Sequence, residues 1–171
     1  LQVMSCGGCG LVQLGHVVDP EILYRKNYPY EASVTRAGRR HWDEFAATVC
    51  AMMALGPDDL VVDFGSNVGV LLEMFTLRGP RVLGIDPASN IVAIANERGV
   101  ETLSGFFNTR TATAAIALKG QAKVITATNV FAHINDLGEV MAALDSLLTP
   151  DGAFIVEVPS LANLVRHLEY D

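Results

Sequence analysis

Two aspartates and two glycines stand at spacings that suit the binding of a nucleotide-like ligand. Asp63 comes just before the turn Gly65-Ser66-Asn67-Val68-Gly69, and Asp86 ends the next apolar run. Gly65 can adopt positive φ and Gly69 allows close helix packing, so a ligand can approach backbone N–H groups. Asp63 could accept a hydrogen bond from a ligand ammonium, and Asp86 from ribose hydroxyls. The alternative is an ordinary strand-to-helix turn in which Asp86 only caps a helix.

Side chains after the later apolar runs complete this candidate site. Phe106 and Phe107 could cover the face of an adenine ring, with core packing as their alternative role. Asn129 follows a further apolar run and is expected to face the same crevice. The binding residues predicted from the first two turns are Asp63, Gly65, Ser66, Asn67, Gly69, Asp86 and Pro87.

Tyr30 and His133 are the candidates for a catalytic role. His133 stands one turn beyond Asn129 and could bind a substrate or transfer a proton. Tyr30 belongs to the proline turn Tyr28-Pro29-Tyr30 and could close over the reacting groups. The alternative for both is structural, because a histidine can shape a pocket wall and a tyrosine can anchor a loop.

These residues require a framework of alternating strands and helices. Short apolar runs predict buried strands, and the stretches between them carry helical periodicity. Strand, helix and strand in repetition predict a Rossmann-like α/β fold, with a parallel sheet covered by helices on both faces. A helix is expected over about 39–55, a type I turn over 149–152, and a capping box from Asp136 to Glu139. The predicted strands are Leu60–Phe64, Arg81–Ile85, Val124–Thr128, Ala153–Val158 and a weaker Val100–Leu103.

Composition narrows the classes of partner. The chain has 171 residues, of which 50% are hydrophobic, and a formal net charge of -7. That charge argues against a nucleic-acid partner, and the basic cluster Arg36, Arg39, Arg40 and His41 is interpreted as a solvated face. No apolar run is long enough to cross a bilayer and no signal peptide is visible, so we expect a cytoplasmic protein with a small-molecule partner.

The turn after Asp63 discriminates between two cofactor classes. An NAD site calls for G-x-G-x-x-G, but Asn67 stands where the middle glycine would be. The arrangement Asp63-x-Gly65-x-x-x-Gly69 instead resembles motif I of the class I methyltransferases. That resemblance implies S-adenosylmethionine (SAM) as the cofactor.

Four further segments stand in the order found in a known family: Cys6–Leu14, Tyr28–Tyr30, Asn129–Leu137 and Asp151–Pro159. Together with the turn at 65–69 they resemble the sugar C-methyltransferases that act on nucleotide-linked keto-deoxysugars. The resemblance implies a zinc knuckle at the first of these segments and a lead into the catalytic core at the second. The family commonly has glutamate where Asp63 stands and an acidic residue where Val68 stands.

The resemblance also implies an earlier C-x-x-C and a later segment with Tyr, His and Glu, neither of which is in this sequence. We therefore expect the chain to be a central piece of a longer protein, with the catalytic base beyond Asp171. Such a piece is expected to bind SAM without turning it over on a keto-sugar nucleotide. Residues 1–38 are interpreted as a partial zinc-knuckle segment and lead-in, and 39–171 as the SAM-binding core.

Cys6 and Cys9 have the spacing of half of a tetrahedral zinc site. We expect structural zinc in the parent protein, but absent or substoichiometric zinc in this chain unless His16 or His41 is recruited. Cys50 lies in an apolar helical pattern and is expected to be packed.

Three functions remain open at this point. The first is C-methylation of a nucleotide-linked keto-deoxysugar. The second is SAM-dependent methylation of an oxygen or nitrogen on another small molecule. The third is a non-catalytic Rossmann-like module that binds a nucleotide.

Overall fold

A five-stranded parallel sheet forms the centre of the computed structural model, which describes residues 2–25, 28–31 and 35–168. The strand order is β5-β4-β3-β6-β7, and every neighbouring pair is parallel. This confirms the predicted Rossmann-like fold. The strands are β3 (Leu60–Phe64), β4 (Arg81–Asp86), β5 (Thr102–Ser104), β6 (Ala122–Thr128) and β7 (Leu148–Glu157).

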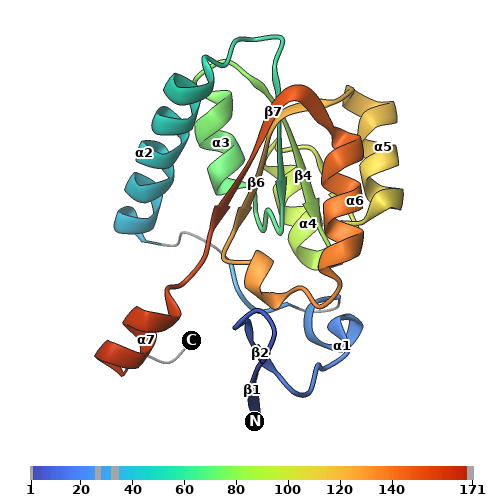
Figure 1. Ribbon diagram of the computed structural model, residues 1–171. Coiled ribbons are helices and arrows are strands. Elements are labelled where there is room, and N and C mark those ends of the chain that lie inside the picture. The colour runs from blue at the N-terminus through green and yellow to red at the C-terminus, as the bar shows by residue number, and fades with distance from the viewer. Residues whose placement is uncertain (1, 26–27, 32–34, 169–171) are drawn as a thin grey trace.

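Helices cover both faces of this sheet (Figure 1). Helices α2 and α3 pack on one face, and α5 and α6 pack on the other. The helices are α1 (Pro20–Tyr24), α2 (Arg36–Met53), α3 (Val70–Thr76), α4 (Ser89–Glu97), α5 (Thr109–Lys119), α6 (Leu137–Leu147) and α7 (Leu161–His167), with a 3₁₀ turn at Phe131–His133. None of the helices in the described ranges is both long and apolar enough to span a membrane.

Each central strand contributes to two hydrophobic layers. Val61 and Val124 pack towards α2 and α3, while Val62 and Phe64 pack towards α5 and α6. This division follows from the two-residue period of a strand, which sends successive side chains to opposite faces. Because β3 is buried on both faces, it appears in the sequence as a continuous apolar run interrupted only by Asp63.

The predicted turn before the last strand is part of that strand. Ala122 pairs with Leu148 and Val124 with Ala153, so residues 149–152 bulge out of the ladder opposite Lys123. β7 therefore begins before the bulge, because residues on both sides of the bulge pair with β6.

The capping box predicted before α6 is half correct. Asp136 Oδ1 accepts a hydrogen bond from the backbone N–H of Glu139, as expected for an N-cap. The Glu139 carboxylate does not complete the box. It accepts hydrogen bonds from the backbone N–H and the hydroxyl of Thr109, and so joins α6 to the start of α5.

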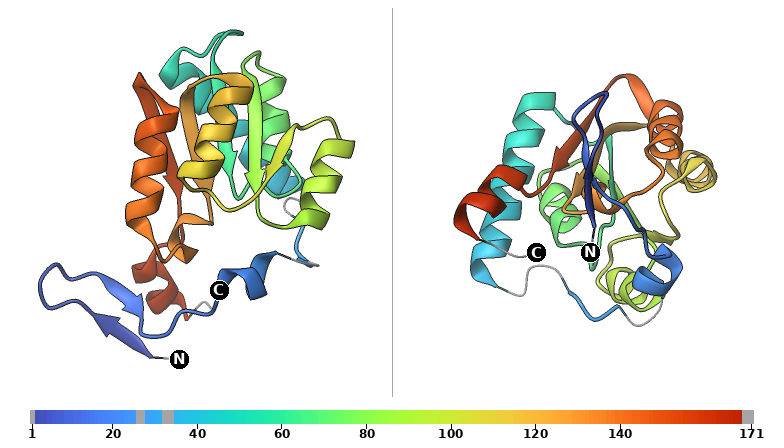
Figure 2. Two further views of the ribbon diagram at one scale, coloured as in Figure 1. Left: turned by 90° about the vertical axis from the view of Figure 1, so that its right-hand side faces the viewer. Right: turned by 60° about the horizontal axis from the view of Figure 1, so that its bottom comes forward.

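The N-terminal arm lies at the edge of the sheet where the parallel strands end (Figures 1 and 2). It consists of the antiparallel hairpin β1 (Val3–Ser5) and β2 (Val12–Leu14), followed by α1. The arm therefore stands over the loops that carry the candidate site.

Candidate functional site

The turn after β3 has the backbone geometry predicted from its glycines. Gly65 and Gly69 have φ of 68° and 82°. The Gly65 N–H donates to the carbonyl of Ile85 at 2.8 Å, which ties the turn to the end of β4. A Cβ on Gly65 would stand 2.7 Å from Val130 Cγ2, in the loop after β6. Three loops therefore converge here, and glycine is required by both conformation and space.

Asp86 organises two of these loops. Its Oδ2 accepts from the Asn67 N–H and its Oδ1 accepts from the Ala88 N–H, each at 2.9 Å. The side chain is buried, and burial raises the pKa of Asp86 while these two hydrogen bonds oppose the rise. Each carboxylate oxygen can accept a further hydrogen bond. Asp86 thus acts as a loop anchor, and the role in binding ribose stays a prediction.

Asp63 lies within β3 and not beyond its end. It is 2% exposed, and its Oδ1 accepts a hydrogen bond from the Thr126 hydroxyl of β6 at 2.7 Å. Burial raises the pKa of Asp63 to about 7, and the nearby charge of Asp86 acts in the same direction. Sequence reasoning missed Thr126, whose signal is a hydroxyl between apolar residues in the interior of β6, the strand that pairs with β3. Contact of Asp63 with a ligand ammonium stays a prediction.

The phenylalanine pair after β5 divides between two environments. Phe107 is buried and stacks on Phe64 with ring centroids 4.2 Å apart and planes 5° apart. This packing agrees with core packing, the alternative role, and contact of Phe107 with an adenine stays a prediction. Phe106 is half-buried and remains a candidate for that contact.

The remaining predicted binding residues also differ in position. Pro87 is half-buried and directly follows Asp86. Ser66 is buried, and its hydroxyl has no hydrogen-bond partner in the described structure. Asn129 is exposed at the end of β6, with φ of 55°, and its N–H donates to the carbonyl of Glu157.

The two catalytic candidates lie on different segments. Tyr30 is 60% exposed, and its carbonyl accepts a hydrogen bond from the Asn67 side chain at 3.0 Å. His133 ends the exposed 3₁₀ turn after β6, where its N–H donates to the carbonyl of Val130. Tyr30 is thus joined to the turn after β3, and catalytic roles for both residues stay predictions.

Cys6 and Cys9 lie in the turn of the N-terminal hairpin as exposed free thiols. Hydrogen bonds from the backbone of Cys9 and Gly8 lower the pKa of the Cys6 thiol, which favours the thiolate that binds metal. Within the described ranges, no group of three or more His, Cys, Asp or Glu residues could hold a metal ion. The two thiols fit half of a zinc site, and zinc in the parent protein stays a prediction.

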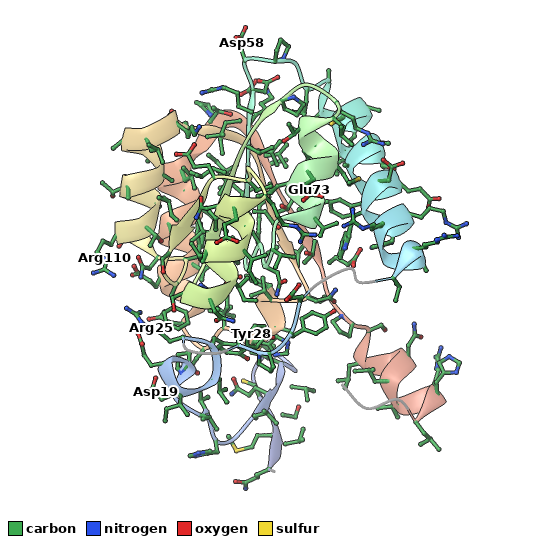
Figure 3. The ribbon with its side chains drawn as sticks, turned by 180° about the vertical axis from the view of Figure 1, so that it is seen from behind. Asp19, Arg25, Tyr28, Asp58, Glu73 and Arg110 are labelled. Atoms are coloured by element: carbon green, nitrogen blue, oxygen red, sulfur yellow. The ribbon has the colours of Figure 1, made fainter. Side chains whose placement is uncertain are left out.

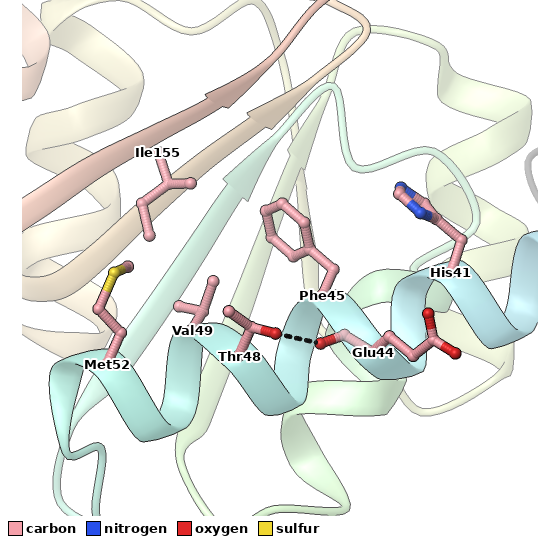
Figure 4. Close-up of a pocket in the computed structure, with 7 residues that line it drawn as sticks. All are labelled: His41, Glu44, Phe45, Thr48, Val49, Met52 and Ile155. Atoms are coloured by element: carbon pink, nitrogen blue, oxygen red, sulfur yellow. Dashed lines mark hydrogen bonds between the residues drawn. The ribbon is translucent and has the colours of Figure 1, made fainter.

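A groove of about 330 Å³ runs between α2 and β7 (Figure 4). Phe45, Val49 and Met52 of α2 and Ile155 of β7 make it largely apolar. His41 lines one end, and its Nε2 lies 2.8 Å from a carboxylate oxygen of Glu157. His41 is exposed and pairs with Glu157 of β7, so the structure does not show it recruited to the hairpin cysteines.

The Gly65 turn, the strand-end Asp86 and the parallel sheet form the arrangement expected for a SAM site. The family model described as "Methyltransferase domain" matches residues 37–171. The chain belongs to the methyltransferase domain family. Its fold and family are those of the class I SAM-dependent methyltransferases, as the motif I resemblance implied.

Individual relatives agree with this assignment. The chain is 39% identical over its whole length to the C-methyltransferase NovU of Streptomyces niveus, and it spans 40% of that protein. It is 26% identical over 96 residues to a ubiquinone biosynthesis O-methyltransferase of Rhodopseudomonas palustris strain BisA53, covering 56% of this chain and 38% of that protein.

A solved structure shares the fold. The geranyl diphosphate C-methyltransferase of Streptomyces coelicolor A3(2), crystallised with S-adenosyl-L-homocysteine, superposes with a TM-score of 0.55 at 17% identity. The match covers 70% of this chain and 46% of that one. The chain thus spans less than half the length of these relatives.

The Asp86→Ala variant is expected to bind SAM more weakly than the unmodified chain by about 1 to 3 kcal/mol, because it loses a charge-assisted acceptor. Isothermal calorimetry measures the difference. Asp58→Ala is the matched control, because it removes an exposed carboxylate at the opposite end of the molecule from Tyr28 (Figure 3). Equal affinity of the Asp86 variant and the control would contradict the assignment.

Proposed function

We propose that the protein containing this chain transfers a methyl group from SAM to a carbon atom of a nucleotide-linked keto-deoxysugar. The crevice at the ends of β3, β4 and β6 would hold SAM. The observation that carries the proposal is the hydrogen bond that joins the Asp86 carboxylate, at the end of β4, to the turn after β3. It occurs in a chain that is similar to NovU over its whole length.

The chemistry defines what the chain must supply. In the transfer, the bond between sulfur and the methyl carbon breaks and a bond from that carbon to the acceptor carbon forms. The sulfur keeps the electron pair of the broken bond. A carbon next to a ketone must also lose a proton to a base, and the resulting enolate oxygen needs stabilisation. Tyr30 and His133 are the candidates in this chain to contact the acceptor.

The composition of the turn after β3 supports SAM over a dinucleotide. SAM has no phosphate, so it needs no cradle of backbone N–H groups for a diphosphate. The turn has Asn67 where a diphosphate site uses its middle glycine. An acidic residue at the position of Asp86 can bind ribose hydroxyls in either cofactor, so it does not discriminate between them.

The binding test is calorimetry of the chain with SAM, S-adenosylhomocysteine and NAD. We expect saturable binding of the first two and none of NAD. Binding of NAD in place of SAM would support the non-catalytic nucleotide-binding module and overturn the proposal.

The acceptor test uses the natural longer protein with methyl-labelled SAM. We expect label in keto-deoxysugar nucleotides at carbon, identified by the retention of label after ester and ether cleavage. The panel includes hydroxyl and amine acceptors, because the O-methyltransferase similarity favours them as the second candidate. Label confined to oxygen or nitrogen would contradict C-methylation while leaving the SAM site intact.

A further inference from the structure

A short segment of the N-terminal arm is fastened across the loops of the candidate SAM site. We call residues 28–31 the strap. The Tyr28 N–H donates to Asn90 Oδ1 at 3.2 Å, and Asn90 Nδ2 donates back to the Tyr28 carbonyl at 3.0 Å. The Tyr28 ring packs against a buried cluster that includes Val68 and Ile91. Figure 3 shows Tyr28 at the junction between the arm and the core.

The second attachment of the strap passes through the cofactor turn itself. Asn67 Nδ2 donates to the Tyr30 carbonyl at 3.0 Å. The backbone N–H of the same residue donates to Asp86 Oδ2 at 2.9 Å. Asn67, which is buried, therefore links two groups: the Asp86 carboxylate, which is predicted to hold the ribose, and the backbone of Tyr30, which is predicted to meet the acceptor.

The conformation of Asn67 matches this double role. Its φ of 51° lies in the left-handed region, which asparagine enters more readily than most residues with a side chain. Glycine would adopt this conformation at lower cost, but it has no amide to reach the strap. The side chain at this position therefore contributes something that the turn alone does not require.

We propose that Asn67 is a positioning residue that couples occupation of the SAM site to the placement of Tyr30. Ribose hydroxyls bound to Asp86 would hold the turn that carries Asn67, and the Asn67 amide would then hold the strap. Coupling between two sites is reciprocal, so a fastened strap also strengthens cofactor binding by the same factor. A bound cofactor would therefore complete the wall that the acceptor meets. This inference rests on the proposed function for the identity of the ligand.

The test measures how strongly S-adenosylhomocysteine protects the strap from trypsin. Arg25 and Lys26 precede the strap in the sequence and Arg36 follows it, so trypsin has cleavage sites on both sides. In the unmodified chain we expect saturating S-adenosylhomocysteine to slow cleavage at these sites about tenfold. In Asn67→Gly, which keeps the left-handed turn and its backbone N–H, we expect protection of less than about twofold.

Asn90→Ala is the matched control. It removes the other asparagine clamp, which holds Tyr28 from within α4, whereas the side-chain hydrogen bonds shown for Asp86 in the described residues go to Asn67 and Ala88. We expect this variant to be cleaved faster with and without ligand, while the protection factor stays near that of the unmodified chain. A purely structural role of Asn67 would give the same pattern as Asn90, with faster cleavage and an unchanged protection factor.

The outcomes separate this inference from the proposed function. If Asn67→Gly binds S-adenosylhomocysteine and is protected as well as the unmodified chain, the coupling role is overturned. If the unmodified chain does not bind S-adenosylhomocysteine in calorimetry, the proposed function fails. The ligand-free cleavage rates of the two variants still report which asparagine fastens the strap. Thermal unfolding of each variant checks that the core remains folded. Fluorescence of the single tryptophan, Trp42, which packs against the same buried cluster as Tyr28, gives an independent signal.

Discussion

The Gly65→Val variant is expected to lose measurable SAM binding and to unfold at a lower denaturant concentration than the unmodified chain. A side chain at φ of 68° costs about 1 to 3 kcal/mol, and a β-branched one is the least tolerated. The added Cβ also meets Val130 Cγ2 at 2.7 Å, and forcing that contact apart costs about 1 to 3 kcal/mol more. The displaced atoms belong to the loop after β6, which is predicted to line the SAM site, so we expect binding to be lost along with stability.

Gly65→Ala should give a smaller loss of both, because its single methyl can be accommodated by a shift of Val130. Gly99→Ala is the control for conformation alone, since Gly99 has φ of 85° with nothing within 4 Å of an added Cβ. Denaturant unfolding and calorimetry of the three variants separate backbone strain from the clash. Equal SAM affinity of the valine and alanine variants at Gly65 would show that this turn does not carry the ligand.

The ligand-free chain is expected to lose stability as the pH rises from about 4 to about 7, because of Asp63. Burial raises its pKa from 3.8 to about 7, so in this window the unfolded chain is ionised while the folded chain keeps the proton. The unfolded state then binds fewer protons, and the free energy of unfolding falls by up to about 4 kcal/mol across the window. The stabilising contribution is complete below pH 3.8 and is lost as the pH passes 7.

Two neighbours determine the size of this effect. The Thr126 hydroxyl from β6 donates to Asp63 and limits the rise in pKa, whereas the Asp86 charge from β4 increases it. Asp63→Asn keeps an oxygen that can accept from Thr126 and carries no ionisable group. We expect this variant to flatten most of the pH dependence in urea unfolding measured from pH 5 to pH 8. An unchanged slope would place the titrating group elsewhere, with Asp86 the first alternative because burial also raises its pKa.

Local patterns were sufficient for the framework of the fold. The strand at 60–64 has the predicted bounds, because a continuous apolar run of that length between turn residues fits a strand buried on both faces. The positive φ at Gly65 and Gly69 also followed from residue type, since glycine adopts this region at little cost. Asp86 could be placed at the end of β4 because an apolar run and its terminal residue are adjacent in the chain.

Predictions that depended on where a side chain points were less successful. Phe106 and Phe107 look alike in the sequence, yet only Phe107 is stacked on Phe64. The strand they follow is three residues long, too short for its period to indicate which ring enters the core. Glu139 likewise had the spacing of a capping box but found a better donor pair on Thr109.

The amino-acid sequence by itself determined the order of strands and helices, the sharp turn after β3 and the presence of two carboxylates near it. Only the tertiary structure decided what those carboxylates and their neighbours contact. The hydrogen bonds of Asp63 with Thr126, and of Asn67 with Tyr30, join positions 63 and 37 residues apart. Periodicity and turn chemistry describe neighbours along the chain, whereas these contacts arise from the pairing of β3 with β6 and from the return of the arm over the strand ends. Burial in that assembly, and not residue type, raises the pKa of Asp63. The two hydrogen bonds of Asn67 in the same assembly join Asp86 at the end of β4 to Tyr30 of the arm.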